Sequence, residues 1–166
     1  MSSITIGFTR LAGSSRDEAP RAPGHVVCLR LTWQLCAENA SALVDAVAAR
    51  VRTAIPPACA VVLDLSATPV IDDGSRVALQ SLHGLLAQDH VGLRLALSGP
   101  RACAQFSSDS AGSALGPDVL HASVRAAMLA EYATFPGPAL VTSALRTLLA
   151  RQPEPLLLGA VLAAPG

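Results

Sequence analysis

The stretch at 60–76, AVVLDLSATPVIDDGSR, constrains the fold of this chain more than any other part. The apolar run at 60–63 predicts a buried strand, and a polar loop leads from it to two acids, Asp72 and Asp73, ahead of a helical pattern. The free N–H groups and the dipole of a helix start favour negative charge. The loop therefore suits a bound phosphate, or an aspartate that stands in for one.

Composition narrows the classes of function. The 166 residues predict a single core, and the net charge of zero argues against nucleic acid or an anionic membrane as partner. All 12 basic residues are arginine, which excludes Schiff-base, P-loop and Ser–Lys chemistry. The four cysteines and four histidines lack metal-ligand spacing, so we expect free thiols, no metal and no cofactor.

The chain shows no signal peptide and no apolar run that could span a membrane, so we expect a cytoplasmic protein. An alanine-, arginine- and proline-rich chain without lysine is also typical of a GC-rich bacterial genome.

The periodicity of apolar residues predicts alternating strands and helices. Besides the strand at 60–63, we expect strands at 4–9, 25–35, 93–97 and 119–121. We expect helices at 75–88, 123–132 and 140–151, and one between residues 39 and 56. This order predicts an α/β fold with a largely parallel sheet.

Two helices carry clear apolar stripes. The first is capped by Asn39 or Ser41 and is ended by Pro56-Pro57. Its expected buried positions are Leu43, Val44, Val47, Val51 and Ile55. The expected buried positions of the helix at 75–88 are Ala78, Leu79, Leu82, Leu85 and Leu86.

The central segment and the order of elements resemble the STAS domain family, which includes bacterial anti-sigma-factor antagonists. The specific match is VVLDLSATPVIDDGS, against a family pattern of Asp-Leu-Ser followed by Ile-Asp-Ser-Ser-Gly. The similarity covers roughly residues 4–132. It implies an α/β, STAS-like fold with a mixed sheet of four or five strands and helices mainly on one face. Residues 133–166 would then form a C-terminal extension with a Pro-containing linker, an amphipathic helix and an apolar tail.

In the antagonists, a partner anti-sigma kinase phosphorylates the serine that follows the loop aspartate. Asp73 stands at that position, which places a permanent negative charge there. Gly74 and Ser75 also depart from the family pattern, as does Trp33-Gln34-Leu35-Cys36, where the family often has Gly-Glu-Leu-Asp. The resemblance therefore implies a constitutive phosphomimic or a protein that does not switch.

More than one role is open for each of the residues in this region. Asp72 and Asp73 are helix caps, a partner-contact surface, or a metal or catalytic pair. Ser66 and Ser75 are caps or alternative phosphoacceptors, and Trp33 is a core residue or a partner-facing anchor. The apolar tail at 156–163 is a docked strand or helix, an oligomer contact or a disordered segment.

We therefore expect a non-enzymatic signalling protein with no catalytic residues. It would bind a protein partner, most plausibly an anti-sigma factor of the serine-kinase type. The contact would involve Asp72, Asp73, Gly74, Ser75 and Arg76, supported by Asp64, Ser66 and Trp33. The alternatives are a small-ligand or lipid-binding STAS module, and a structural or oligomerising subunit. The oligomeric state is open.

Overall fold

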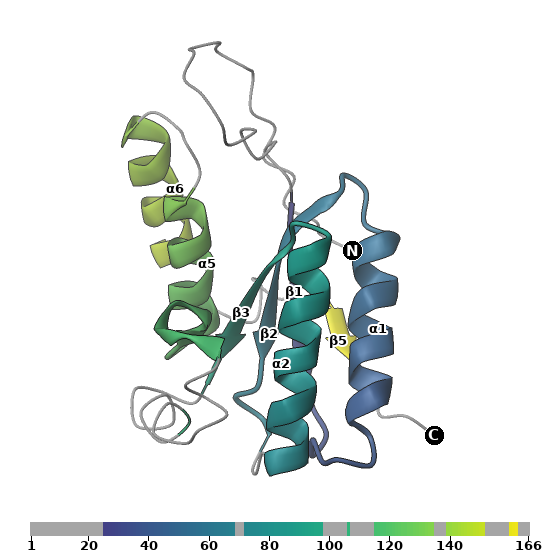
Figure 1. The fold of residues 1–166 in the computed structure, drawn as a ribbon. Coiled ribbons are helices and arrows are strands. Elements are labelled where there is room, and N and C mark those ends of the chain that lie inside the picture. Colours follow the sequence, from purple (N-terminus) through teal and green to yellow (C-terminus); the bar gives the residue numbers. More distant parts are fainter. Residues whose placement is uncertain are drawn as a thin grey trace.

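Five strands form one sheet in the described part of the chain, with the order β4-β3-β2-β1-β5 (Figure 1). The computed structural model describes residues 25–68, 72–97, 106, 115–134, 139–151 and 160–162. The strands are β1 (His25–Leu31), β2 (Ala58–Asp64), β3 (Gly92–Ala96), β4 (Leu120–His121) and β5 (Ala160–Leu162). All the described pairings are parallel, so this part of the sheet lacks the antiparallel pair of a mixed sheet.

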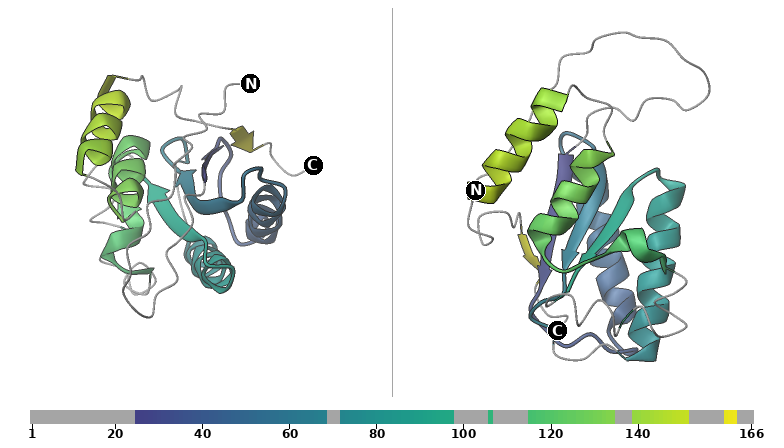
Figure 2. Two further views of the ribbon diagram at one scale, coloured as in Figure 1. Left: turned by 90° about the horizontal axis from the view of Figure 1, so that it is seen from above. Right: turned by 90° about the vertical axis from the view of Figure 1, so that its left-hand side faces the viewer.

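Helices cover both faces of the sheet. They are α1 (Ala40–Arg52), α2 (Asp73–Gln88), α5 (Val124–Ala133) and α6 (Ala139–Arg151), with a short 3₁₀ helix, η1 (Pro117–Val119). Helices α1 and α2 lie side by side on one face, and α5 packs on β2 and β3 from the other face with α6 beside it (Figures 1 and 2). Helix α5 therefore lies on the opposite face from α1 and α2, where β2 and β3 also carry apolar side chains.

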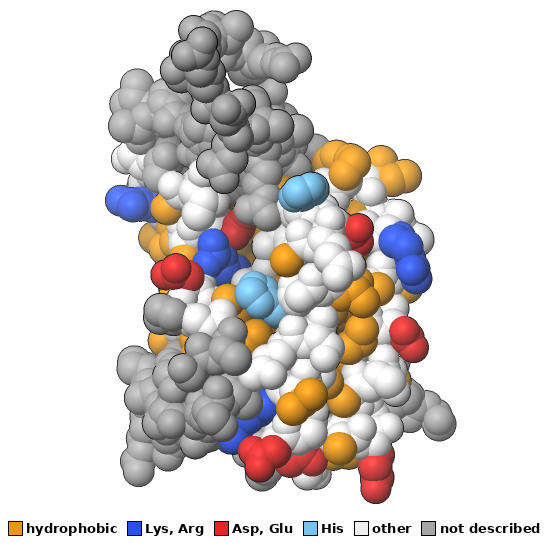
Figure 3. All heavy atoms as spheres, in the orientation of Figure 1, with side chains coloured by type: hydrophobic (Ala, Val, Ile, Leu, Met, Phe, Trp, Pro, Cys, Tyr) orange, Lys and Arg blue, Asp and Glu red, His pale blue; other side chains and the backbone are white. Residues whose placement is uncertain are grey.

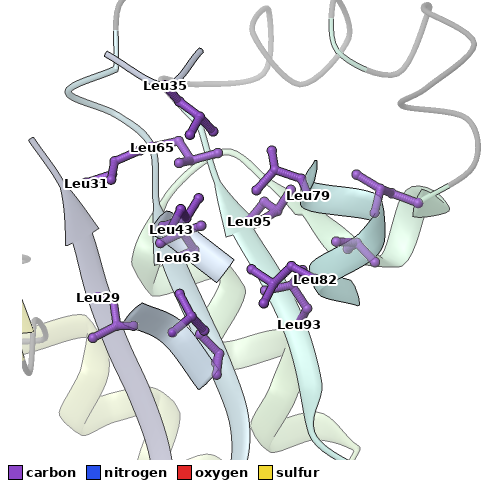
Figure 4. Close-up of a cluster of buried hydrophobic side chains, with 14 of the residues drawn as sticks. Leu29, Leu31, Leu35, Leu43, Leu63, Leu65, Leu79, Leu82, Leu93 and Leu95 are labelled. Carbon is purple, nitrogen blue, oxygen red and sulfur yellow. The ribbon is translucent and has the colours of Figure 1, made fainter. Parts of the chain in front are cut away.

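The main core lies between the sheet and helices α1 and α2. Alternate strand residues point to this face, so β1, β2 and β3 each contribute leucines or valines to it (Figure 4). Ten of its fully or almost fully buried members are Leu29, Leu31, Leu35, Leu43, Leu63, Leu65, Leu79, Leu82, Leu93 and Leu95. Leucine and valine thus supply the packing in a chain that has few aromatic residues.

The face of the sheet toward α5 carries smaller side chains than the face toward α1 and α2. Its strand residues include the small side chains of Ala60, Gly92 and Ala96, which allow the helix to approach closely. A second apolar cluster here contains Cys28, Val62, Ala96, Val124, Ala127, Met128 and Leu149. Burial and the nearby charge of Asp64 raise the pKa of the Cys28 thiol to about 12. Cys28, Cys36 and Cys59 are free thiols, as expected, whereas Cys103 lies outside the described residues.

Several local expectations need correction. Helix α1 ends at Arg52, so Ile55 lies beyond it and is 93% exposed instead of belonging to the buried stripe. Leu85 of α2 is 40% exposed, because only Leu79, Leu82 and Leu86 face the core fully. The N-cap position of α1 is Asn39, but its side chain forms no cap hydrogen bond.

The C-terminal expectations fall partly within the described residues. Helix α6 is present, and the apolar tail contributes the strand β5. The strand expected at 4–9 and the linker at 135–138 lie outside the described residues. None of the helices in the described ranges is long and apolar enough to cross a membrane.

Candidate functional site

The candidate site lies at the carboxyl edge of the sheet, where α1 and α2 begin. Parallel strands end at a common edge, so the loops after β1 and β2 lie together there, at the lower end of the view in Figure 1. Acidic side chains gather on the surface at this end (Figure 3). The segment Asp72–Arg76 forms the start of α2 within this region.

Asp72 is the N-cap of α2. Its Oδ1 accepts hydrogen bonds from the Ser75 amide at 2.8 Å and from the Ser75 hydroxyl at 2.6 Å. Its Oδ2 accepts a longer bond, 3.3 Å, from the amide of Ala37 in the loop before α1. The bonds from the Ser75 hydroxyl and amide hold the pKa of Asp72 below its usual value of 3.8. Asp72 therefore caps its own helix and ties it to the neighbouring loop.

Asp73 occupies the first turn of α2 and points away from the protein. Its side chain is 94% exposed, and Oδ1 lies 3.0 Å from Nη1 of Arg76, one turn further along the helix. The Arg76 guanidinium also lies over the ring of Phe106, 5.5 Å from the ring centre. The Arg76 side chain is therefore only 19% exposed, while the Asp73 carboxylate stays open to solvent.

Gly74 allows the loop before α1 to contact α2 closely. A Cβ atom at this position would lie 2.4 Å from Cβ of Ala37 and 3.1 Å from its Cα. Only glycine fits here without a shift of the loop. The serine that the family pattern places at this position would need a wider spacing between the two segments.

The two serines of the region have different surroundings. Ser75 is fully buried, and its hydroxyl is used by Asp72. Ser66 is exposed, and its amide donates to Oδ1 of Asp64 at 2.9 Å. Of the two, only Ser66 presents its side chain at the surface.

Asp64 is buried within the fold and forms an ion pair there. It is 1% exposed at the end of β2, and its Oδ2 lies 2.7 Å from Nε of Arg30 on β1. One carboxylate therefore pairs with the neighbouring strand and orders the loop that follows β2. Its side chain is on the face toward α5, away from the start of α2.

Trp33 follows β1 and packs against the main core with partial exposure. Its indole Nε1 is buried and has no hydrogen-bond partner among the residues that the structure describes. The structure thus brings Asp72, Asp73, Gly74, Ser75 and Arg76 together on one helix start. Trp33 packs against the main core, and Asp64 pairs with Arg30 on the other face of the sheet.

Sequence reasoning missed two parts of this site. The loop at 34–39 supplies Ala37, and Asn39 braces it by accepting from the Cys36 amide and donating to the Gln34 carbonyl, both at 2.9 Å. Phe106 supports Arg76 from 30 positions further along the chain, and no local pattern marks that contact. The Asn at a helix start was the available signal for the first part.

Within the described ranges, no group of three or more His, Cys, Asp or Glu side chains is placed to hold a metal ion. Asp72 and Asp73 diverge, since the first turns back to Ser75 and the second turns to Arg76. The arrangement thus leaves the Asp73 carboxylate exposed at the start of α2.

The comparison with known families agrees with this geometry. Residues 18–104, more than half of the chain, match the family model of the STAS domain. The chain belongs to the STAS domain family. The match confirms the resemblance over a shorter range than residues 4–132. No curated protein and no solved structure matches this chain.

Membership supports the α/β, STAS-like fold and a general STAS-family role. STAS domains are generally non-enzymatic, and membership suggests contact with another protein. The exposed start of α2 lies inside the matched residues.

Proposed function

We propose that this STAS domain is a signalling protein of the anti-sigma-factor antagonist type, acting in the bacterial cytoplasm. It binds a protein partner through the start of α2, Asp72–Arg76, and the adjoining loop at 36–37. Asp73 takes the place of the phosphoacceptor serine and supplies a charge that no kinase adds and no phosphatase removes.

The exposure of Asp73 carries this proposal. A residue that served only to cap α2 would turn toward the free N–H groups, as Asp72 does. Asp73 instead leaves 94% of its side chain open to solvent at the position equivalent to the phosphoacceptor. Because Asp72 already caps the helix, the charge of Asp73 is available to a partner.

The charge at this surface is smaller than that of a phosphorylated serine. A phosphoserine carries about −1.5 to −2 charges at pH 7, whereas aspartate carries one. Arg76 lies 3.0 Å from the Asp73 carboxylate and partly offsets it. We therefore expect the chain to resemble the phosphorylated state of an antagonist only in part, and to bind a serine-kinase anti-sigma factor weakly.

The test is the substitution Asp73→Ser, with binding to a serine-kinase anti-sigma factor from the same organism measured by calorimetry. The variant should bind at least about tenfold more tightly, a change of about 1.4 kcal/mol, and should take up phosphate from ATP. Asp89→Ser, at the opposite end of α2, is the matched control and should change neither property. Unchanged affinity together with no phosphate uptake in Asp73→Ser would refute the phosphomimic role.

Two further measurements separate the other two functions considered from the sequence. In a structural or oligomerising subunit, Asp73→Asn leaves partner binding unchanged. In a ligand-binding module, apolar molecules co-purify with the protein and are detected by mass spectrometry of the denatured sample.

A further inference from the structure

The short strand β4 lies at one end of the strand order and leads into α5. It spans only Leu120–His121 and pairs with Leu95 and Ala96 of β3. The carbonyl of His121 also accepts a hydrogen bond of 2.8 Å from the amide of Leu97. A strand of this length opens locally at low cost. The side chains beside β4 therefore have a large influence on whether it stays in the sheet.

Arg94 and His121 lie on the same face of the sheet. His121 pairs with Ala96, and Arg94 stands two residues before Ala96 on β3. Side chains alternate along a strand, so all three point to the face that α5 covers. Ala96 belongs to the apolar cluster on this face, and Arg94 contacts Glu131 of α5.

One carbonyl oxygen joins the two basic side chains. The carbonyl of Asp118 accepts a hydrogen bond from Nη1 of Arg94 and one of 3.1 Å from Nε2 of His121. Because a carbonyl oxygen can only accept, Nε2 carries the proton of the neutral imidazole. The ring takes up its second proton at Nδ1, and this creates a second cation beside the Arg94 guanidinium.

The surroundings of the His121 ring disfavour that second charge. The described charged groups that act on it are Arg94 on β3, Asp118 on η1 and Glu131 on α5. Glu131 is already paired with Arg94 at 2.9 Å, and Asp118 is exposed to solvent. Burial of the ring and then the Arg94 charge lower the pKa of His121 below its usual value of 6.5, although the two acids and the Asp118 carbonyl act in the opposite direction.

We propose that His121 is an acid-sensitive latch, which holds β4 against β3 while its ring is neutral and releases the strand when the ring is protonated. In the released strand the ring gains water and moves away from the Arg94 guanidinium, so both causes of the unfavourable charge are removed. The latch acts on β4 and on the adjoining ends of η1 and α5. It is a property separate from the contact at the start of α2.

The direction of the pH effect follows from the two states of the strand. A released His121 binds a proton with its usual pKa of 6.5, whereas the closed strand binds it less readily. The contact is therefore at full strength above 6.5 and weakens as the pH falls through 6.5 toward the lower pKa of the closed state.

The test is hydrogen exchange of the full-length chain, followed by NMR between about pH 7.5 and about pH 5. The amide of Leu97 reports the closed strand, because it donates to the His121 carbonyl. The amide of Leu63, on the inner strand β2, is the internal reference. After correction for the intrinsic effect of pH, protection of Leu97 should fall at least about threefold relative to Leu63 as the pH is lowered. The fall should follow the titration of the His121 ring signals.

Two variants locate the effect in one side chain. His121→Gln keeps an N–H group for the Asp118 carbonyl but does not titrate, so its Leu97 protection should stay constant over this range. His83→Gln, on α2, is the matched control and should keep the pH dependence of the parent. Constant protection of Leu97 in the parent while His121 titrates overturns the proposal, because the ring then takes up its proton without releasing the strand. An undiminished fall in His121→Gln overturns it as well.

Discussion

Asp72 and Asp73 are neighbours in the sequence with opposite roles. Asp72 accepts two hydrogen bonds from Ser75 and one from Ala37, which fix its carboxylate in place. Asp73 forms an exposed ion pair with Arg76. An ion pair of this kind contributes little to stability, so the structural role belongs to Asp72, whereas the role proposed for Asp73 is contact with a partner.

Asp72 should make the stability of the protein depend on pH in the acid range. Its pKa in the folded state lies below 3.8 because Ser75 donates to the ionised carboxylate. The stabilisation is therefore present above 3.8 and is lost as the pH falls through the lower pKa of the folded state. Asp72→Asn should remove this part of the acid dependence, as measured by urea unfolding from neutral pH to below 3.8.

Asp89→Asn, at the other end of α2, is the control for this measurement. It should keep the acid dependence that Asp72 contributes. Parallel profiles for the parent and Asp72→Asn below 3.8 would contradict the role of the Ser75 hydrogen bonds.

The sequence identifies the acids of this site but not the difference between them. Two acids ahead of a helix predict a cap, and which one caps depends on where the helix begins. We expected the helix to start at residue 75, whereas α2 starts at Asp73. The contact of Arg76 with Phe106 joins distant parts of the chain, so no local pattern indicates it.

At the scale of elements, α2 and the loop before α1 form one unit. Gly74 lets the loop approach, and the Ala37 amide donates to the Asp72 carboxylate. A partner that contacts the start of α2 therefore also meets the loop at 36–37. Movement of either segment would change the surface that carries Asp73.

Gly74→Ala should destabilise the protein by about 1–3 kcal/mol, the usual effect of inserting a methyl group into a packed contact. The new Cβ would lie 2.4 Å from Cβ of Ala37, and this clash outweighs the gain in helix propensity. Combining it with Ala37→Gly should restore most of the loss. Urea unfolding of the two single variants and the double variant measures the effect.

Gly84→Ala is the matched control, because a Cβ at Gly84 of the same helix meets no atom within 4 Å. It should be neutral or stabilising, by up to about 1 kcal/mol. A stabilising effect of Gly74→Ala, equal to that of Gly84→Ala, would show that the loop gives way and that the close contact is unimportant.

Periodicity locates the helices but not their last turns. The apolar stripe of α1 continues through Ile55 in the sequence, yet the helix ends at Arg52, before Pro56. Leu85 fits the stripe of α2 but lies at its margin, where the core does not reach it. The first miss comes from where the helix ends ahead of the proline, and the second from how far the neighbouring layer extends over α2.

At the scale of the molecule, different interactions hold the helices against the two faces of the sheet. The face toward α1 and α2 is almost entirely aliphatic. The face toward α5 includes two ion pairs, Arg30 with Asp64 and Arg94 with Glu131. The sequence predicts the apolar face from its alternation, whereas the ion pairs join residues 34 and 37 positions apart and depend on the sheet order.

Arg94 and Glu131 connect α5 to the sheet. Glu131 is fully buried, and its Oε2 lies 2.9 Å from Nε of Arg94 on β3. The Arg94 guanidinium also donates to the carbonyl of Asp118, next to β4. Gly92 leaves room for the carboxylate, since a Cβ there would lie 3.3 Å from the same Oε2. The pair thus brings three elements together at one point.

Replacing one residue of the Arg94–Glu131 pair should therefore lower the free energy of unfolding by more than replacing both. Glu131→Leu leaves the Arg94 charge largely buried without its carboxylate, for which we expect a loss of about 3–5 kcal/mol in the free energy of unfolding. The double variant Arg94→Met with Glu131→Leu replaces the pair by apolar groups and should recover most of that loss. A double-mutant cycle from urea unfolding measures the coupling between the two residues. If the two effects simply add, the charges do not depend on each other, and apolar packing alone holds α5 on the sheet.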